Sequence, residues 1–371
     1  MIYSIGYIRG LSALFVMLFH YKDFLNDVYA QKNLGSILFG SGSVGVDLFF
    51  VISGFIIFYS TRKIEEKSVA KFLIRRVFRI YPLLILSILF FIWVSPNKFT
   101  VIEVIRALVP LNKDYYDSAP YFGYNAYPLA WTLTYEMLFY SIFMTAMAIS
   151  HKYRALVSSI IIMAMVCGIQ LYFSGSLSLN AHARVDGIPK LPGAGILQLL
   201  SSPMLFEFVY GMVLAFIYDA IKVRGNSVQV TTSKIYLWVC GCLFATLWFS
   251  YINEGAGPIN YGVWALIIIP SALAYEKING IKPNAKLLFF GDISYSLYLV
   301  HILVPFFLGY KASFDPFYIH LTGVAKLIYV GMISIVCAYF DRKTNDKTFK
   351  KNHKQIIIIP THYRIICMAM R

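Results

Sequence analysis

The chain has 371 residues, of which 58% are hydrophobic and only 14% are charged, and its mean hydropathy is +0.65. Soluble proteins carry about 25% charged residues, so this chain could not cover a globule of its size with polar surface, and a soluble domain is excluded. The net charge of +15 does not indicate a nucleic-acid partner here, because the cytoplasmic loops of membrane proteins collect lysine and arginine.

The apolar residues come in blocks of about 17–25, the length that crosses the hydrocarbon core of a bilayer as a helix. About ten spans are predicted, near residues 5–22, 40–60, 72–94, 129–149, 155–174, 195–217, 234–251, 260–276, 287–309 and 318–340. The expected fold is therefore all-α, a polytopic transmembrane helical bundle. We expect residues 1–341 to form one integral-membrane domain and residues 342–371 a basic cytoplasmic tail without an assigned role.

The distribution of positive charge predicts the orientation of this bundle. The loop after the second span carries Arg62, Lys63 and Lys67, and every second loop after it is basic as well. The loops between these, among them the long aromatic segment 95–128, are poorer in positive charge for their length. The positive-inside rule then places both termini in the cytoplasm, which agrees with an even number of spans.

Ionisable residues inside a span are costly and usually face a cavity or a partner. Arg9 and His20 lie eleven residues apart in the first span, which is about three helical turns, so both lie on one face and roughly 16 Å apart along the axis. A shared cavity is the favoured interpretation. The alternative is that each residue simply sits at one membrane interface.

Two further features lie in the second and third spans. Asp47, in GVDLFFVISGF, is a carboxylate that must be paired or hydrated, unless it is only a helix N-terminal acid favoured by the dipole. Arg75, Arg76 and Arg79 are neighbours on one helix surface. They form either a clamp for phosphate or an ordinary cytoplasmic signal of membrane topology.

The remaining candidates lie in later spans. Glu136 is about two turns into its span, where an unpaired carboxylate is expensive, and Trp131 is either a substrate contact or an interfacial aromatic residue. Ser294, Tyr298 and His301 follow the i, i+4, i+7 rule and line one helical stripe, although His301 alone reads equally well as a buried core histidine. Glu207 is a weaker candidate of the same kind.

Six segments together resemble the membrane acyltransferase-3 family. They are Arg9-x10-His20, GVDLFFVISGF, RRVFRIYP, AWTLTYEMLFYSIF, LFEFVYGM and ISYSLYLVH. The resemblance covers about residues 5–340 and implies an O-acetyltransferase of the bacterial exopolysaccharide or O-antigen type. Such an enzyme moves an acyl group, usually acetyl from acetyl-CoA, to a sugar hydroxyl of a surface or exported glycan. The chain departs from the family after its last span, where it has YFDRKTND.

The chemistry implied by this resemblance assigns roles to the candidate residues. His20 is the expected general base, since its ordinary pKa lies near neutrality, and Asp47 or Glu136 would orient it. Arg9, Arg75, Arg76 and Arg79 would bind the acyl-CoA, and Trp131, Ser294, Tyr298 and His301 the acceptor.

The same reading defines the expected partners. They are acyl-CoA, a glycan or lipid-linked saccharide, and the lipid bilayer of the bacterial inner (plasma) membrane, with no nucleic acid. No permanently bound cofactor is expected, and no metal, because the five cysteines include no CxxC pair.

Two other classes of function compete with an enzyme. A transporter of an anionic glycan or lipid-linked precursor would also show ten spans, intramembrane charge and basic inner loops. Transporters are often built from inverted repeats with broken helices, and no internal repeat is found in this sequence. A non-enzymatic assembly scaffold is less favoured, because it would have little use for His, Asp, Glu and Arg within its spans.

Overall fold

A computed structural model describes residues 2–64, 67–191, 193–250, 252, 254–311 and 314–356, with side chains as far as residue 342. In this part of the chain all regular secondary structure is helical. The first half contains α1 (Tyr3–Tyr21), α2 (Leu34–Phe39), α3 (Val44–Ser60), α4 (Ser68–Val94), α5 (Val101–Leu108), α6 (Ala130–Ile149) and α7 (Arg154–Ser174). The second half contains α8 (Ile196–Leu200), α9 (Phe206–Ala220), α10 (Ser227–Ser250), α11 (Tyr261–Asn279), α12 (Ala285–Val300), α13 (Leu303–Tyr310), α14 (Pro316–His320) and α15 (Gly323–Ile356). Short 3-10 turns, Lys22–Phe24, Gly40–Ser43 and Pro203–Leu205, extend or precede three of these helices.

Seven helical segments in the described residues are long and apolar enough to cross a membrane, and the bent pair α12 and α13 makes an eighth. Large apolar side chains are exposed along several of them, for example Tyr172, Trp238 and Phe216. Such surfaces suit lipid, where helices satisfy their backbone groups internally. The protein is therefore a multi-pass membrane helical bundle.

The sequence predicted about ten spans, and each predicted segment overlaps helical residues, although 195–217 covers both α8 and α9 and 287–309 covers both α12 and α13. Two 19-residue helices, α1 and α11, are not among the candidate spans. Their polar residues explain this, since Arg9 and His20 lower the mean hydropathy of α1, and Glu276 and Lys277 lower that of α11. The prediction for residues 342–371 falls partly on the end of α15 and otherwise outside the described residues.

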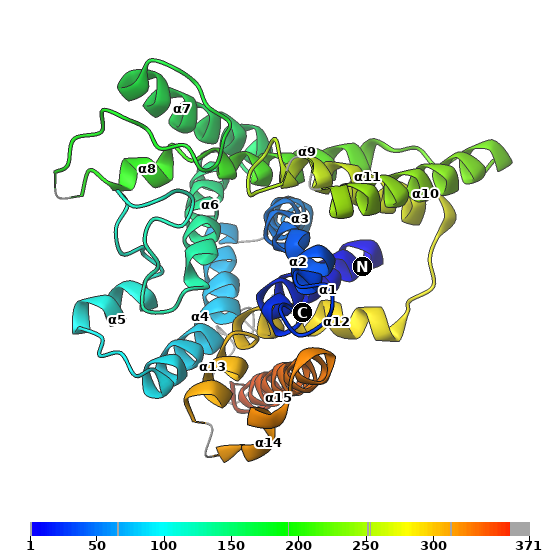
Figure 1. Ribbon diagram of the computed structural model, residues 1–371. Coiled ribbons are helices and arrows are strands. Elements are labelled where there is room, and N and C mark those ends of the chain that lie inside the picture. Colours follow the sequence, from blue (N-terminus) through cyan, green and yellow to red (C-terminus); the bar gives the residue numbers. More distant parts are fainter. Residues whose placement is uncertain are drawn as a thin grey trace.

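Helix α1 lies in the middle of the bundle, between α3 and α12 (Figure 1). Close approach to α12 depends on glycine, because a Cβ at Gly10 would overlap the backbone of Gly291. The contact continues to the pair His20 and His301, so α1 and α12 run parallel. Glycine plays the same part where α3 crosses α9, as small residues commonly do in membrane bundles. There, a Cβ at Gly54 would overlap the carbonyl of Phe208.

Two further contacts fix this arrangement. The carboxylate of Glu276, on α11, accepts hydrogen bonds from the backbone N–H groups of Tyr3 and Ser4, both at 2.7 Å. A carboxylate is stabilising there, because the first N–H groups of a helix lack intrahelical partners and carry the positive end of its dipole. On the other side of the bundle, Phe208 of α9 stacks on Phe139 of α6, with ring centroids 4.3 Å apart, and on Phe50 of α3.

Candidate active site

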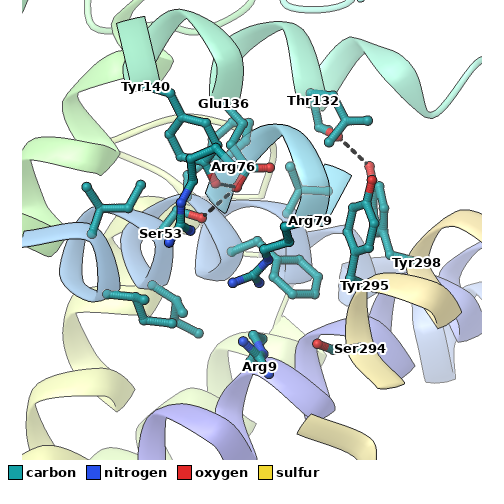
Figure 2. A pocket seen from close by; sticks show the side chains of 17 residues that line it. Arg9, Ser53, Arg76, Arg79, Thr132, Glu136, Tyr140, Ser294, Tyr295 and Tyr298 are labelled. Carbon is teal, nitrogen blue, oxygen red and sulfur yellow. Dashed lines mark hydrogen bonds between the residues drawn. The ribbon is translucent and has the colours of Figure 1, made fainter. Parts of the chain in front are cut away.

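A cavity opens between α1, α3, α4, α6 and α12 and is shown in Figure 2. Its charged lining consists of Arg9, Arg76, Arg79 and Glu136. Its polar lining consists of Ser53, Thr132, Tyr140, Ser294, Tyr295 and Tyr298, and the rest is aliphatic or aromatic. Three arginines face one carboxylate, so the cavity carries an excess of positive charge.

The arginines enter the cavity from two helices (Figure 2). Arg76 and Arg79 are three residues apart on α4 and therefore neighbours on its surface. The Nε atom of Arg76 is buried and has no hydrogen-bond partner among the described residues. Arg9 comes from α1 and donates from Nε to the carbonyl of Gly291 at 3.1 Å. Arg75, which the sequence grouped with these residues, is not part of the cavity lining.

Glu136 occupies the wall of the cavity on the side of α6. Its Oε1 accepts a hydrogen bond from the Ser53 hydroxyl at 3.3 Å and another from the hydroxyl of Tyr140. Two hydroxyl donors therefore stabilise its carboxylate, which lies in the same cavity as Arg76 and Arg79. Its predicted function as the partner of His20 stays a prediction, because Glu136 makes no hydrogen bond to His20 in the described part of the chain.

The predicted base, His20, is paired with a second histidine. Nδ1 of His20 lies 3.1 Å from Nε2 of His301 and 2.9 Å from the carbonyl of Val16. His301 is completely buried, whereas His20 is exposed. Tyr298 connects this pair with the cavity, since it lines the cavity and its ring lies 5.9 Å from that of His301.

Ser294 and Tyr298 share the stripe on α12 that their spacing predicts, and both line the cavity. The Ser294 hydroxyl donates to the Gly291 carbonyl at 2.9 Å, the same oxygen that binds Arg9. The Tyr298 hydroxyl is hydrogen-bonded to Thr132 at 2.8 Å. Trp131 lies elsewhere, packed edge-on against Tyr121 of the 95–128 segment at 4.8 Å.

Asp47 lies in a second buried polar cluster outside this cavity. Its Oδ1 accepts a hydrogen bond from the backbone N–H of Gly257 at 2.7 Å, and it interacts electrostatically with Glu207 of α9. The two carboxyl groups are 1% and 0% exposed. Asp47 is not hydrogen-bonded to His20, so its catalytic role also stays a prediction.

Sequence reasoning missed several residues of the site. Ser53, Tyr140 and Tyr295 line the cavity but resemble ordinary span residues, so only the intramembrane position of a hydroxyl could have drawn attention to them. The hydroxyl of Tyr295 donates a hydrogen bond to the carbonyl of Ile80 at 2.8 Å and so joins α12 to α4. Glu207 was the weakest candidate in the sequence, yet it is completely buried.

The Asp47 cluster yields a test that separates structural from catalytic importance. Asp47→Asn keeps an acceptor for the Gly257 N–H, so its thermal stability in detergent should stay close to that of the wild type. Asp47→Leu leaves that buried N–H without an acceptor and should lose about 1–3 kcal/mol. Equal stability of the two variants would contradict the structural role. A loss of acyl transfer in Asp47→Asn at unchanged stability would instead support the catalytic role.

Comparison with known proteins places the chain in a family. The model of an acyltransferase domain matches residues 2–340. The exopolysaccharide production protein ExoZ of Rhizobium meliloti (strain 1021) is 25% identical over 278 residues, which cover 71% of this chain and 76% of that protein. Nodulation protein 10 of Rhizobium leguminosarum bv. viciae is 22% identical over 285 residues, covering 70% of this chain and 71% of that protein.

The O-acetyltransferase OatA of Staphylococcus aureus (strain NCTC 8325 / PS 47) is 24% identical over 350 residues, or 83% of this chain. The match spans only 53% of that protein, about half of its length. No solved structure matches the chain significantly. The family match covers nearly the whole chain and confirms the resemblance seen in the sequence motifs: the chain belongs to the acyltransferase-3 family and is a membrane acyltransferase.

Proposed function

We propose that this acyltransferase moves an acetyl group from acetyl-CoA, supplied from the cytoplasm, to a hydroxyl of a surface or exported glycan. The observation that carries the proposal is a cavity lined by three arginines and by Tyr298, whose ring lies 5.9 Å from that of His301 in the histidine pair. The names of the relatives agree with it, since one is an exopolysaccharide production protein and another an O-acetyltransferase. The donor is a co-substrate in this scheme, and no permanently bound cofactor takes part.

The arginine cavity suits the phosphates of coenzyme A. Guanidinium groups bind phosphate through two parallel hydrogen bonds, and the buried Nε of Arg76 has no partner among the described residues. Binding an anion would therefore satisfy a donor that the polypeptide leaves open. Glu136 lies in the same cavity, and its negative charge would offset the repulsion between these cations when no donor is bound.

Acyl transfer itself needs a base and a route from the cavity to that base. His20 lies at the end of α1, about 16 Å along the helix axis from Arg9. Tyr298 forms the wall between the cavity and the histidine pair. In this scheme the phosphates stay at the arginines while the pantetheine arm extends past Tyr298, which brings the thioester to His20 and the acceptor hydroxyl.

Loss of the base tests the function directly. Deletion of the gene should remove acetyl groups from the surface glycan, seen by mass spectrometry as the loss of increments of 42 daltons (roughly one acetyl each). The wild-type gene should restore them, whereas His20→Ala should transfer acetyl about two to four orders of magnitude more slowly at normal expression. Unchanged acetylation in the deletion strain, or purified protein that never consumes acetyl-CoA with glycan present, would favour the transporter interpretation.

The arginine cavity makes a separate prediction about the donor. Arg76→Lys with Arg79→Lys keeps both charges but removes the planar fork, so KM for acetyl-CoA should rise about ten- to a hundredfold while KM for the glycan hardly moves. Arg75→Lys is a second test. If Arg75 binds the donor together with Arg76 and Arg79, as the sequence suggested, KM for acetyl-CoA should rise comparably. If only the cavity lining binds it, that KM should not change. Arg224→Lys, at an exposed loop position, is the matched control. A KM for acetyl-CoA within twofold of wild type in the double variant would contradict the clamp.

Both termini are proposed to lie in the cytoplasm, with residues 1–341 as the membrane domain, residues 342–371 as a basic tail, and the enzyme in the inner membrane. The parallel course of α1 and α12 is compatible with this, since both would cross outwards. A cysteine at Ser118 should react with an impermeant thiol reagent in spheroplasts, and one at Lys222 should not. Labelling of the unchanged chain is the background, and the reverse pattern would overturn the orientation.

A further inference from the structure

The two histidines meet where the α12 span is broken. α12 ends at Val300 and α13 begins at Leu303, with a bend of 41° between them, and His301 lies in the break. The rings of His20 and His301 are 5.0 Å apart, and Nδ1 of His20 faces Nε2 of His301 at 3.1 Å. This contact joins an exposed imidazole to a completely buried one.

The hydrogen-bond partners of the two rings indicate which nitrogen of each ring carries the hydrogen. Nδ1 of His301 lies 3.1 Å from the carbonyl of Leu297, and a carbonyl only accepts, so this nitrogen carries the hydrogen. A neutral imidazole carries one N–H, which leaves Nε2 of His301 as an acceptor. That acceptor faces Nδ1 of His20, which also lies 2.9 Å from the carbonyl of Val16. Both neighbours of Nδ1 in His20 are thus acceptors, so its hydrogen sits there and Nε2 is unprotonated.

The surroundings of the pair keep His301 neutral. The groups that face it are the Tyr21 and Tyr298 rings and His20, and Lys22 is the charged group beside His20. Among the residues described, no carboxylate is hydrogen-bonded or ion-paired with either ring. An imidazolium at His301 would therefore be a buried charge without a counter-ion, which is costly.

We propose that His301 is a positioning residue, which holds His20 in the tautomer with hydrogen on Nδ1 and leaves the Nε2 lone pair free to act as the base. The inference rests on the proposed acetyl transfer. The sequence had suggested that Asp47 or Glu136 orients His20 and that His301 binds the acceptor. In this proposal His301 has the orienting role instead. The logic is that of a base oriented by a third group, with an imidazole in place of a carboxylate.

The step balances without a further reactant. The glycan hydroxyl oxygen attacks the thioester carbonyl carbon while its proton moves to Nε2 of His20. The new C–O bond forms, the C–S bond breaks, and the leaving sulfur takes the proton back from Nε2. While His20 is charged, its Nδ1–H donates to the neutral Nε2 of His301. The products are an O-acetyl ester and the coenzyme A thiol.

Two substitutions of His301 separate positioning from other roles. His301→Gln places an amide oxygen near the position of Nε2 and keeps the acceptor, so kcat should stay within about threefold of wild type. His301→Met is of similar size without a comparable acceptor and should lower kcat about ten- to a hundredfold, the effect of one lost hydrogen bond to a charged group. KM for the glycan should stay within twofold in both. His320→Gln, at an exposed histidine of α14, is the control.

These assays use membrane vesicles, acetyl-CoA and polysaccharide purified from the deletion strain. Equal losses in Gln and Met variants, no loss in either, or a rise in KM alone would each overturn the proposal. A second measurement does not depend on activity or on the folding of the His301 variants. The 15N NMR spectrum of wild-type protein, with His20 assigned through His20→Gln, should show an unprotonated Nε2. A hydrogen on Nε2 of His20 would overturn the proposal even if acetyl transfer is found, whereas absence of transfer in the wild type would refute only the proposed function.

Discussion

The parallel contact between α1 and α12 is the constraint on which the rest of the site depends. The two helices approach so closely only because Gly10 and Gly291 lack side chains where their backbones meet. That approach places the guanidinium of Arg9 on the carbonyl of Gly291 and, further along the same two helices, His20 on His301. One helix pair thus fixes the position of Arg9, whose charge suits an anion, and that of the histidine pair, which suits proton transfer. The distance between them is set by the helical rise.

The membrane also accounts for how polar groups are distributed between the helices. A polar group in hydrocarbon is expensive unless it is paired, and several buried polar groups are matched here by a partner from a distant segment. Glu276 binds the start of α1, and Asp47 binds the Gly257 N–H. Arg9 and His20 lower the hydropathy of α1, and Glu276 and Lys277 lower that of α11, which is why these two helices resemble membrane spans less than α4 or α7 do.

Much of this could be predicted from the sequence, because it depends on local periodicity. Run length located the helices, and the eleven-residue spacing correctly predicted that Arg9 and His20 share a face, which in the structure is the face toward α12. Periodicity does not determine the rotation of a helix against its neighbours, so it could not show that Arg76 and Arg79 line the cavity and Arg75 does not.

Partners far away in the chain were beyond the reach of the sequence. The apolar surroundings of Asp47 indicated that it must be paired or hydrated, but they could not show its partners, since Glu207 and Gly257 lie 160 and 210 residues further on. The pairing of His20 with His301 is hidden for the same reason, since it spans 281 residues. Taken alone, His20 could be an interfacial residue and His301 a buried core histidine. Only the contact between them indicates that the two rings act together.

The break between α12 and α13 has a consequence for how acceptors are selected. The carbonyl of Leu299 accepts a hydrogen bond from Tyr127 of the segment before α6, and that of His301 accepts one from Tyr21. Tyr127 is completely buried, so moving this part of the segment would leave a buried carbonyl unsatisfied, at about 1–3 kcal/mol. The segment next to Tyr127 therefore behaves as a fixed rim and not as a lid. In the proposed reaction, a glycan that approaches the histidine pair past this segment would meet a surface that is already formed, and selectivity among sugars would then come from steric exclusion.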